Sequence, residues 1–328
     1  MRRAPAFWRA NGPAARVLAP LGGIYGAVAA RRLRREAPRA ALPTIVVGGL
    51  TAGGDGKTPF VIALAGLLAQ FGERPALLTR GYGGRRRTGS FVVEPNETAE
   101  TAGDEALLLA RHALTIAGAD RVVSADTALG MSATAVILDD GFHSRRLAAD
   151  LAFLVIDSEY AAGNGHCLPA GPLRAPLLAQ FDAADAVVVI GDGAGGAVLA
   201  SRAEKPVFRA EVVARPSATL AGARVVAFAG IGRPEKFFRT AADAGAQIVA
   251  RRVFPDHHRF SATDMAELAA VARRHAARLL TTEKDAVRLP AGSPAVETLP
   301  VRLIVAEQDA LAATLAQALE KARLSRAC

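Results

Sequence analysis

The sequence predicts an α/β fold built from parallel sheets. Its 328 residues are 51% hydrophobic and 22% charged, which allows a large core and excludes global disorder. From Pro43 onward, short apolar runs alternate with helical stretches, the pattern of βαβ units. A glycine-rich turn separates the first apolar run from the first of these helices. The length fits one large domain or two smaller ones.

The first part of this pattern, up to about residue 205, predicts six strands and two helices. A second glycine-rich stretch, Gly191–Gly196, is interpreted as a loop. In the second expected helix, Asp104 and Glu105 would occupy the first turn, where the helix dipole favours acids. We expect strands at Thr44–Val47, Ala76–Thr79, Arg121–Ser124, Ala135–Leu138, Leu151–Ile156 and Ala186–Ile190, and helices at Pro59–Gln70 and Gly103–Leu114.

A second alternating unit begins around residue 206. Ser261 is expected to cap a helix that runs to about Ala277, with Asp264 completing a capping box. The other expected elements are strands at Arg224–Ala229, Gln247–Val253, Arg278–Thr281 and Val301–Val305, a helix from Pro234 and a closing helix Asp309–Leu324. The sequence therefore predicts an N-terminal segment (1–40), a core (41–206) and a smaller C-terminal α/β domain (207–328).

The N-terminal segment carries most of the excess charge. Net charge is +9, and residues 1–40 hold nine arginines, Arg2 and Arg3 among them, against one acid. The uncharged stretch Val17–Ala30 is too short to cross a bilayer, and Pro20 and three glycines weaken it as a helix. We favour a segment that associates with an anionic membrane surface. Two alternatives remain for this segment. It could be a signal peptide, or it could be a first helix that packs on the domain and has a solvated basic flank.

The glycine-rich turn, Gly48 to Pro59, has the features of a phosphate-binding P-loop. It lies between an expected strand and an expected helix, so backbone N–H groups and the helix dipole can surround an anion. Lys57 would reach the β- and γ-phosphates of ATP, and the Thr58 hydroxyl would bind Mg²⁺. The strict pattern has glycine where this chain has Thr51, so the loop is a variant. The expected phosphate-binding residues are Thr51, Ala52, Gly53, Gly54, Asp55, Gly56, Lys57 and Thr58.

Two acids follow the apolar run that precedes Gly141. Asp139 and Asp140 end a buried strand, where a P-loop protein places a Mg²⁺ partner, although apolar strands ending in Asp are common. Both are candidate metal ligands, together with Thr58. The core is thus expected to be a P-loop NTPase-like α/β/α domain.

Other polar residues could act on a hydroxyl group or hold an anion. Asp104 is a candidate for orienting a nucleophile, or an ordinary capping acid. His257 lies in a polar loop, 254–260, in which a carboxylate could orient an imidazole. The segment 281–285 follows a strand and could line a ligand crevice or form a solvated turn. Arg174, in a stiff Pro-Ala-Gly-Pro loop, suits an anion or a salt bridge.

Taken together, these segments resemble the tetraacyldisaccharide 4′-kinase (lipid A 4′-kinase) family. The pieces that match, in the family's order, are the variant P-loop, Thr79–Gly84, Gly103–Glu105, Leu138–Phe142, Pro169–Arg174, Phe228–Gly232, Phe254–His258 and Thr281–Asp285. The resemblance covers nearly the whole chain.

The resemblance implies transfer of the ATP γ-phosphoryl group to the 4′-hydroxyl of a lipid A disaccharide precursor, with Mg²⁺. It implies peripheral association with the cytoplasmic face of the bacterial inner membrane. By position, Asp104 resembles the catalytic acid/base, His257 its partner and Lys57 the catalytic phosphate residue. Arg80 and Arg174 are candidate contacts to substrate or nucleotide. No obligate protein partner is expected.

Some positions depart from the family's pattern. The family usually has Asn at the position of Gly49, Gln-His at His143-Ser144, and commonly Glu at Ala175. We therefore assign no role to His143, Ser144 or Ala175.

Two other classes of protein remain alternatives. A switch ATPase that acts on a protein partner often has lysine where this chain has Ala52. A nucleic-acid-binding ATPase would use the excess of basic residues, but these are confined to the first 40 residues without interleaved aromatics, so no nucleic-acid partner is expected.

Overall fold

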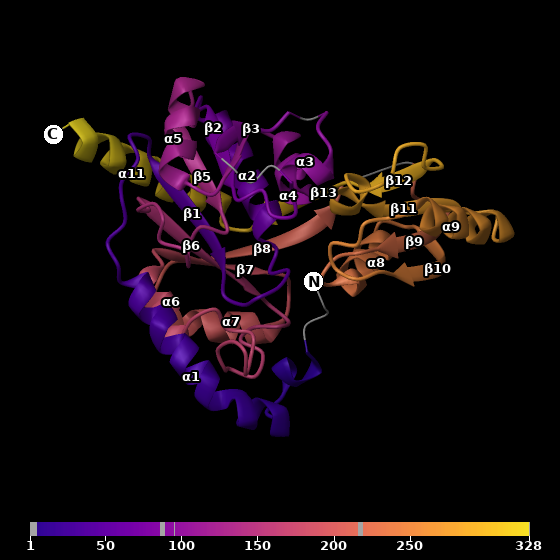
Figure 1. Cartoon of the computed structure of the whole chain (residues 1–328), viewed down its shortest axis with the longest axis horizontal. Coiled ribbons are helices and arrows are strands. Elements are labelled where there is room, and N and C mark those ends of the chain that lie inside the picture. The colour runs from indigo at the N-terminus through magenta and orange to yellow at the C-terminus, as the bar shows by residue number, and fades with distance from the viewer. Residues whose placement is uncertain (1–4, 86–88, 95, 216–218, 328) are drawn as a thin grey trace.

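The computed structural model describes residues 5–85, 89–94, 96–215 and 219–327. Arg2 and Arg3 of the predicted N-terminal segment lie outside these ranges. Within them the chain forms two sheets, each covered by helices on both faces, and the smaller sheet lies to one side of the larger (Figure 1).

The larger sheet has nine strands in the described residues, in the order β13-β8-β7-β6-β1-β5-β2-β4-β3. Only its outermost pairs, β13 with β8 and β3 with β4, are antiparallel. The carboxyl ends of the parallel strands therefore meet at one edge, where ligands bind in open α/β sheets. The strands are β1 (Thr44–Gly49), β2 (Pro75–Thr79), β3 (Ser90–Val92), β4 (Leu114–Gly118), β5 (Ala135–Asp139), β6 (Leu151–Asp157), β7 (Ala186–Ile190), β8 (Val207–Ala214) and β13 (Val301–Val305).

Helices cover this sheet because each presents an apolar stripe to it. One face is packed by α2 (Lys57–Gln70), α4 (Asp104–Ala110) and α11 (Gln308–Ala327) through a cluster that includes Phe60 and Leu315. The other face is packed by α5 (Arg121–Gly130), α6 (Leu177–Ala183) and α7 (Ala194–Ala200). The short helices of this part are η1 (Ala6–Arg9), α3 (Ala99–Ala102) and η2 (Ser201–Ala203).

The smaller sheet is parallel, in the order β10-β9-β11-β12. Helix α8 (Pro234–Asp243) packs Phe237 and Phe238 on one face, and α9 (Ala262–Arg274) packs Met265 and Leu268 on the other. The predicted capping box between Ser261 and Asp264 is confirmed at the start of α9. The remaining elements are β9 (Arg224–Ala229), β10 (Gln247–Val253), β11 (Arg278–Thr282), α10 (Glu283–Ala286) and β12 (Val296–Leu299).

Three predicted elements are wrong. The expected strand Arg121–Ser124 is the start of helix α5, because Asp120 caps it by accepting hydrogen bonds from Val122 N and Val123 N. The expected helix Gly103–Leu114 ends at Ala110, and the chain then enters β4, which pairs with β2. The predicted loop Gly191–Gly196 includes the first turn of α7.

The sheets do not follow a division of the chain at residue 206. Strands β8 and β13 and helix α11 all belong to the larger sheet or pack on it, although they fall within the expected C-terminal domain, 207–328. The physical reason is pairing: β8 continues the larger sheet beside β7, and β13 returns to pair with it. Figure 1 shows β8 running from the larger sheet toward the smaller one.

The N-terminal segment contains a 21-residue helix, α1 (Pro13–Leu33), despite Pro20 and its glycines. Two of these glycines allow the helix to pack closely against the loop that contains Cys167. A Cβ at Gly22 would lie 2.9 Å from Cys167 O, and a Cβ at Gly26 would lie 3.1 Å from Cys167 Sγ. Helix α1 lies beside α6 along the edge of the molecule (Figure 1). No helix among the described residues has the length and apolar character needed to cross a membrane.

Candidate active site

A cleft of about 1590 Å³ opens between the two sheets. The P-loop and β5 line it from the larger sheet, and the start of α8, the loop after β10 and the end of β11 line it from the smaller sheet. The walls therefore come from strand ends and helix starts, as expected for a ligand site in α/β proteins. The cleft contains most of the residues that the sequence singled out.

The P-loop, residues 51–58, joins β1 to α2 as predicted. Gly56 has a φ of +86° at the N-cap of α2, and a Cβ there would lie 2.8 Å from Ile190 Cδ1, so only glycine fits. Lys57 and Thr58 follow at the helix start and line the cleft. Lys57 Nζ lies 3.5 Å from Gly53 O and 3.8 Å from Asp140 Oδ1. The lysine is thus held beside both the loop and a strand-end acid.

Thr51 and Asp55 form an internal brace of the loop. The Thr51 hydroxyl donates to Asp55 Oδ1 at 2.6 Å, and Thr51 N donates to Asp55 Oδ2 at 3.2 Å. Burial raises the pKa of Asp55, although Lys57, Thr51 and Arg233 act in the opposite direction. A Cβ at Gly49 would overlap Asp55 Oδ2 and lie 3.0 Å from Lys57 Nζ. The glycine at position 49 therefore leaves the space that the Asp55 carboxyl occupies.

The two acids at the end of β5, Asp139 in the strand and Asp140 just after it, have different environments. Asp139 is buried, and its Oδ1 accepts no hydrogen bond from the residues described. Its Oδ2 lies 3.5 Å from the Thr58 hydroxyl. Burial, followed by the charges of Glu105 and Asp140, raises the pKa of Asp139 to about 7. A buried carboxyl with an unused oxygen beside a P-loop threonine fits a Mg²⁺ ligand pair, because Mg²⁺ takes few protein oxygens and completes its shell with phosphate and water.

Asp140 is instead paired with Arg174. The Nη1 atom of Arg174 donates to both carboxylate oxygens of Asp140, at 2.7 and 2.9 Å, while its Nε donates to Thr51 O at 3.0 Å. Burial opposes ionisation of Asp140, but Lys57 and Arg174 hold its pKa far below the usual range. Arg174 thus makes the salt bridge that the sequence left open. Arg80 is exposed and lines the same cleft.

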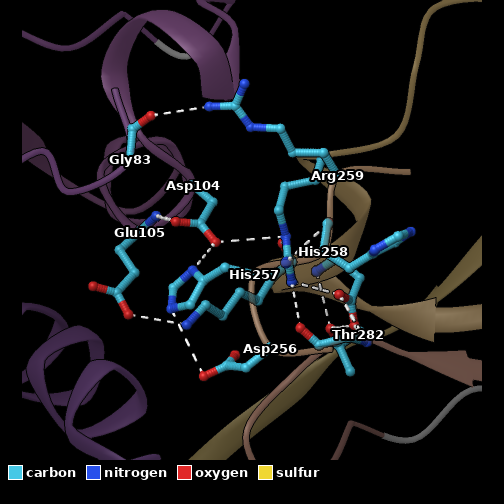
Figure 2. Close-up of polar contacts among 12 residues, drawn as sticks. Gly83, Asp104, Glu105, Asp256, His257, His258, Arg259 and Thr282 are labelled. Atoms are coloured by element: carbon cyan, nitrogen blue, oxygen red, sulfur yellow. Dashed lines mark hydrogen bonds and ion pairs between the residues drawn. The ribbon is translucent and has the colours of Figure 1, made fainter. Parts of the chain in front are cut away.

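Asp104 and His257 meet across the cleft (Figure 2). Asp104 begins α4, where Gly103, with a φ of +93°, packs so closely on Tyr82 O that a Cβ would lie 2.5 Å from it. His257 Nδ1 lies 2.7 Å from Asp104 Oδ2, and since a carboxylate only accepts, Nδ1 is the protonated ring nitrogen. Burial raises the pKa of Asp104, but the His257 hydrogen bond and the charges of Lys284 and Arg288 lower it below its ordinary value.

Further ion pairs join the walls of the cleft. Lys284 Nζ lies 2.9 Å from Glu105 Oε1, and Thr282, Glu283 and Lys284 of the predicted segment 281–285 line the cleft. At the other end, Asp157, the last residue of β6, pairs with Arg233 and Lys236 at the start of α8. Sequence reasoning missed Asp157 and both of these bases, since only the fold brings them together; the polar start of the helix after Gly232 was the available signal.

The cleft also contains a buried arginine that was missed. Arg121 lies at the start of α5, and its Nη1 donates to Thr79 O and to Gly118 O. Burial lowers its pKa to about 10, while Asp139 acts in the opposite direction. Arg121 was not predicted as a site residue because Arg121–Ser124 was wrongly predicted as a strand rather than as the start of α5.

The positions that depart from the family pattern lie beside the cleft. Gln180 of α6 lies 2.7 Å from His143 Nε2 and donates to Ala175 O at 2.6 Å. Ser144 donates to Gly141 O and lines the cleft. Burial lowers the pKa of His143 to about 4. His143 is thus neutral and joined through Gln180 to the loop that carries Arg174.

A P-loop at the start of α2, acids at the end of a neighbouring strand, and an acid–imidazole pair facing them define a P-loop kinase. The family model for tetraacyldisaccharide-1-P 4′-kinase matches residues 14–320. The chain belongs to this family.

Known relatives agree with this assignment. The tetraacyldisaccharide 4′-kinase of Methylobacterium nodulans is 50% identical over 316 residues, covering 94% of this chain and 93% of the relative. That of Methylorubrum populi is 47% identical over 327 residues, covering 98% and 100%. Among solved structures, the Aquifex aeolicus protein LpxK in complex with ATP matches with a TM-score of 0.72 and 26% identity, covering 93% of this chain and 99% of that one.

Proposed function

We propose that this protein transfers the γ-phosphoryl group of ATP to the 4′-hydroxyl of tetraacyldisaccharide 1-phosphate, giving the 1,4′-bisphosphorylated lipid IVA. The observation that carries the proposal is the hydrogen bond between Asp104 and His257, because the His257 imidazole lines the same cleft as the P-loop. A kinase needs that arrangement, because the acceptor hydroxyl must lie in line with the phosphoryl group that it receives. The chain's family and the ATP complex of the Aquifex aeolicus relative support the substrates.

The nucleotide site in this proposal is the loop 51–58. Its backbone N–H groups and the N-terminus of α2 bind phosphate oxygens, and Lys57 binds the β- and γ-phosphates. Thr51 and Asp55 hold the loop's shape through their hydrogen bonds, so they act on phosphate indirectly. Arg80 and Arg174 line the cleft as further contacts to nucleotide or acceptor.

Mg²⁺ in this proposal is held by Thr58 and Asp139. The described residues contain no cluster of three or more His, Cys, Asp or Glu that could hold a metal alone, so phosphate and water would complete the shell. When bound, the ion supplies neutralisation of the charge on the β- and γ-phosphates. Asp140, already paired with Arg174, holds Lys57 nearby and contributes as a second acid of the site.

Asp104 orients the acceptor and takes its proton. The bond that forms joins the 4′-oxygen to the γ-phosphorus, and the bond that breaks joins this phosphorus to the oxygen that leaves with ADP. The hydroxyl proton passes to the Asp104–His257 pair. Asp104 is suited to this role because its lowered pKa keeps it ionised, and His257 fixes the orientation of its carboxylate.

The first test is transfer of labelled γ-phosphate to purified tetraacyldisaccharide 1-phosphate in detergent with Mg²⁺. We expect a labelled bisphosphorylated lipid from the wild-type protein and none from Lys57→Ala, which loses the phosphate-binding ammonium. ATP hydrolysis of equal rate with and without lipid, and no lipid product, would contradict the proposal and favour a switch ATPase.

We also propose that α1 associates with the cytoplasmic face of the inner membrane. Val17, Leu21, Ile24 and Val28 form an apolar stripe on α1, each more than half exposed, and the helix is followed by exposed arginines up to Arg35. An apolar stripe with a basic flank binds anionic membranes. In this proposal residues 1–40 form the membrane-associating part of the chain.

Flotation with vesicles containing anionic lipid tests this role. Val17→Glu combined with Ile24→Glu should weaken binding, because it places charge on the stripe. The matched control is Val123→Glu, an exposed valine of α5, which packs on β3 and β4 far from α1 and α6 (Figure 1). Equal flotation of all three proteins would contradict the role of α1.

A further inference from the structure

Arg288, which follows α10, lies within ion-pair distance of the Asp104–His257 pair. Its side chain is only 3% exposed, and its Nε lies 3.5 Å from Asp104 Oδ2, the same oxygen that accepts from His257. A buried guanidinium needs an acid and several acceptors to remain stable in the interior. The contacts of Arg288 therefore indicate what it holds in place.

Asp285 supplies the acid. It is fully buried and accepts from Gly230 N at 3.1 Å, from the Thr282 hydroxyl at 2.7 Å and from Arg288 Nη2. Burial raises the pKa of Asp285, and Arg288 acts most strongly in the opposite direction. Asp285 thus fixes one edge of the guanidinium at the end of β9, where Gly230 begins the loop toward α8.

Nε of Arg288 donates to Lys284 O at 3.3 Å, and two further hydrogen bonds of the guanidinium reach the backbone around His257. Nη1 donates at 3.2 Å to the carbonyl oxygen of His258, the residue that follows His257. Nη2 donates to Gly230 O at 3.0 Å, and this carbonyl also accepts from His257 N at 3.0 Å. His257 has a φ of +57°, a left-handed conformation that a non-glycine residue keeps only when its surroundings impose it. The two arms of the Arg288 guanidinium thus bind backbone carbonyls on either side of this residue.

We propose that Arg288 is a positioning residue for the phosphoryl transfer proposed above. It holds the backbone of His257 in its left-handed conformation and so sets the hydrogen bond between His257 Nδ1 and Asp104 Oδ2. Its charge also stabilises the ionised form of Asp104. Arg288 contacts neither the P-loop nor its two strand-end acids in the described structure, so its effect is confined to the acceptor side of the reaction. The inference rests on the proposed function.

Steady-state kinetics of Arg288→Met and Arg288→Lys test the inference. The Met variant removes both fork and charge, so kcat should fall on the order of 10²-fold, the effect of a misplaced reacting group, with KM for ATP unchanged. The Lys variant keeps the charge but cannot bind Gly230 O and His258 O together, so it should recover only part of kcat. It also serves as the test if the Met variant does not fold.

Arg326→Met is the matched control. Arg326 binds an acid, Asp150, and two backbone carbonyls, Ala40 O and Leu42 O, but it lies away from the cleft. Its loss should lower the melting temperature without lowering kcat of the folded protein. If Arg288→Met and Arg326→Met lower melting temperature and kcat alike, Arg288 is only structural and the inference fails.

The pH profile of kcat separates positioning from stability. Because Asp104 must be ionised, loss of the Arg288 charge should move the acid limb upward by about one pH unit, as expected when a nearby cation is removed. Arg288→Lys and Arg326→Met should leave the limb in place. The charged groups that face Asp104 and stay unchanged in all variants are His257 and Asp256 after β10, Lys284 and Asp285 around α10, and Glu105 on α4.

A readout independent of turnover keeps this inference separable from the proposed function. The imidazole nitrogen chemical shifts of His257, assigned with His257→Gln, report which ring nitrogen carries the proton. Wild-type protein should show protonated Nδ1, and Arg288→Met a mixture of tautomers. A wild-type protein without lipid product would refute the proposed function, whereas an unchanged tautomer and acid limb in Arg288→Met would refute the positioning role.

Discussion

The close packing of Gly49 against the Asp55 carboxyl predicts how a side chain at residue 49 would affect ATP binding by the P-loop. Any side chain at this position would overlap the Asp55 carboxyl and press on Lys57 Nζ. Gly49→Asn, which introduces the residue usual for the family, should therefore displace Asp55 from Thr51. The double variant Gly49→Asn, Asp55→Ser should restore the loop, because serine removes the carboxyl that occupies the space.

The size of the effect follows from the bonds that Asp55 makes. Thr51 donates to it twice, at 2.6 and 3.2 Å. Loss of one such hydrogen bond lowers stability by about 1.5 kcal/mol. If that energy is lost from the ordered loop that binds phosphate, KM for ATP should rise roughly tenfold. The effect on Lys57 should be smaller than that on Asp55. Only Lys57 Nζ, the flexible end of a long side chain, lies near residue 49, and it can move aside.

The assay is a titration of ATP at saturating lipid acceptor for wild type, Gly49→Asn, Asp55→Ser and the double variant. We expect the single change at residue 49 to raise KM for ATP, and the double variant to lie closer to wild type than the single one, which is a favourable coupling between the two positions. A wild-type KM in Gly49→Asn, or strictly additive effects in the double variant, would refute the steric reasoning.

The remaining predictions concern the acid–imidazole pair, the buried histidine and the cleft walls. Asp104→Asn should lower kcat by about 10²–10⁴-fold with KM for ATP unchanged, since it removes a proton acceptor but no phosphate ligand; normal turnover would contradict its role. The pKa of His143 is lowered from 6.5 to about 4, so the unfolded chain binds its proton first and stability should fall as pH drops from about 6.5 to 4. His143→Gln should flatten that part of the stability curve, and an unchanged slope would count against neutral His143. Asp157→Asn should lower the free energy of unfolding by about 3 kcal/mol, because it leaves two bases at the start of α8 without their buried acid. Thermal melting measures this loss, with Asp192→Asn as the control; equal melting temperatures of the two variants would contradict it.

Local patterns were sufficient to predict the parts of the site that are contiguous in sequence. The strand before Gly48, the turn to Lys57 and the helix after it appear as expected, because glycine permissiveness and apolar periodicity act over a few residues. The acids Asp139 and Asp140 end their strand as predicted. The fold class also followed from alternation, and the structure adds the mixed larger sheet with its antiparallel margins.

Contacts between distant segments could not be predicted in this way. Arg288 is one of many arginines in the chain, and nothing in its neighbourhood marks it as the base beside Asp104. The same holds for Asp157 with Lys236, which lie 79 positions apart. Residues 207–214 fell within the expected C-terminal domain and no strand was predicted there, whereas hydrogen bonding to β7 places them in the larger sheet as β8. Long-range pairing is a property of the fold, and local periodicity does not encode it.

The distribution of charge shows why a count of basic residues misleads about the ligand of the cleft. The excess of arginine lies in residues 1–40, whereas the cleft brings acids from the larger sheet against bases from the smaller one. Those bases are already paired with Asp157, Glu105 and Asp104, so their pairing joins the two walls of the cleft. In the proposed function, an incoming polyphosphate would then be bound by the backbone N–H groups of the P-loop and by Lys57, with Arg80 lining the same cleft. In the proposed function, phosphate recognition would therefore centre on the P-loop, and the smaller sheet would contribute chiefly by holding His257 against Asp104.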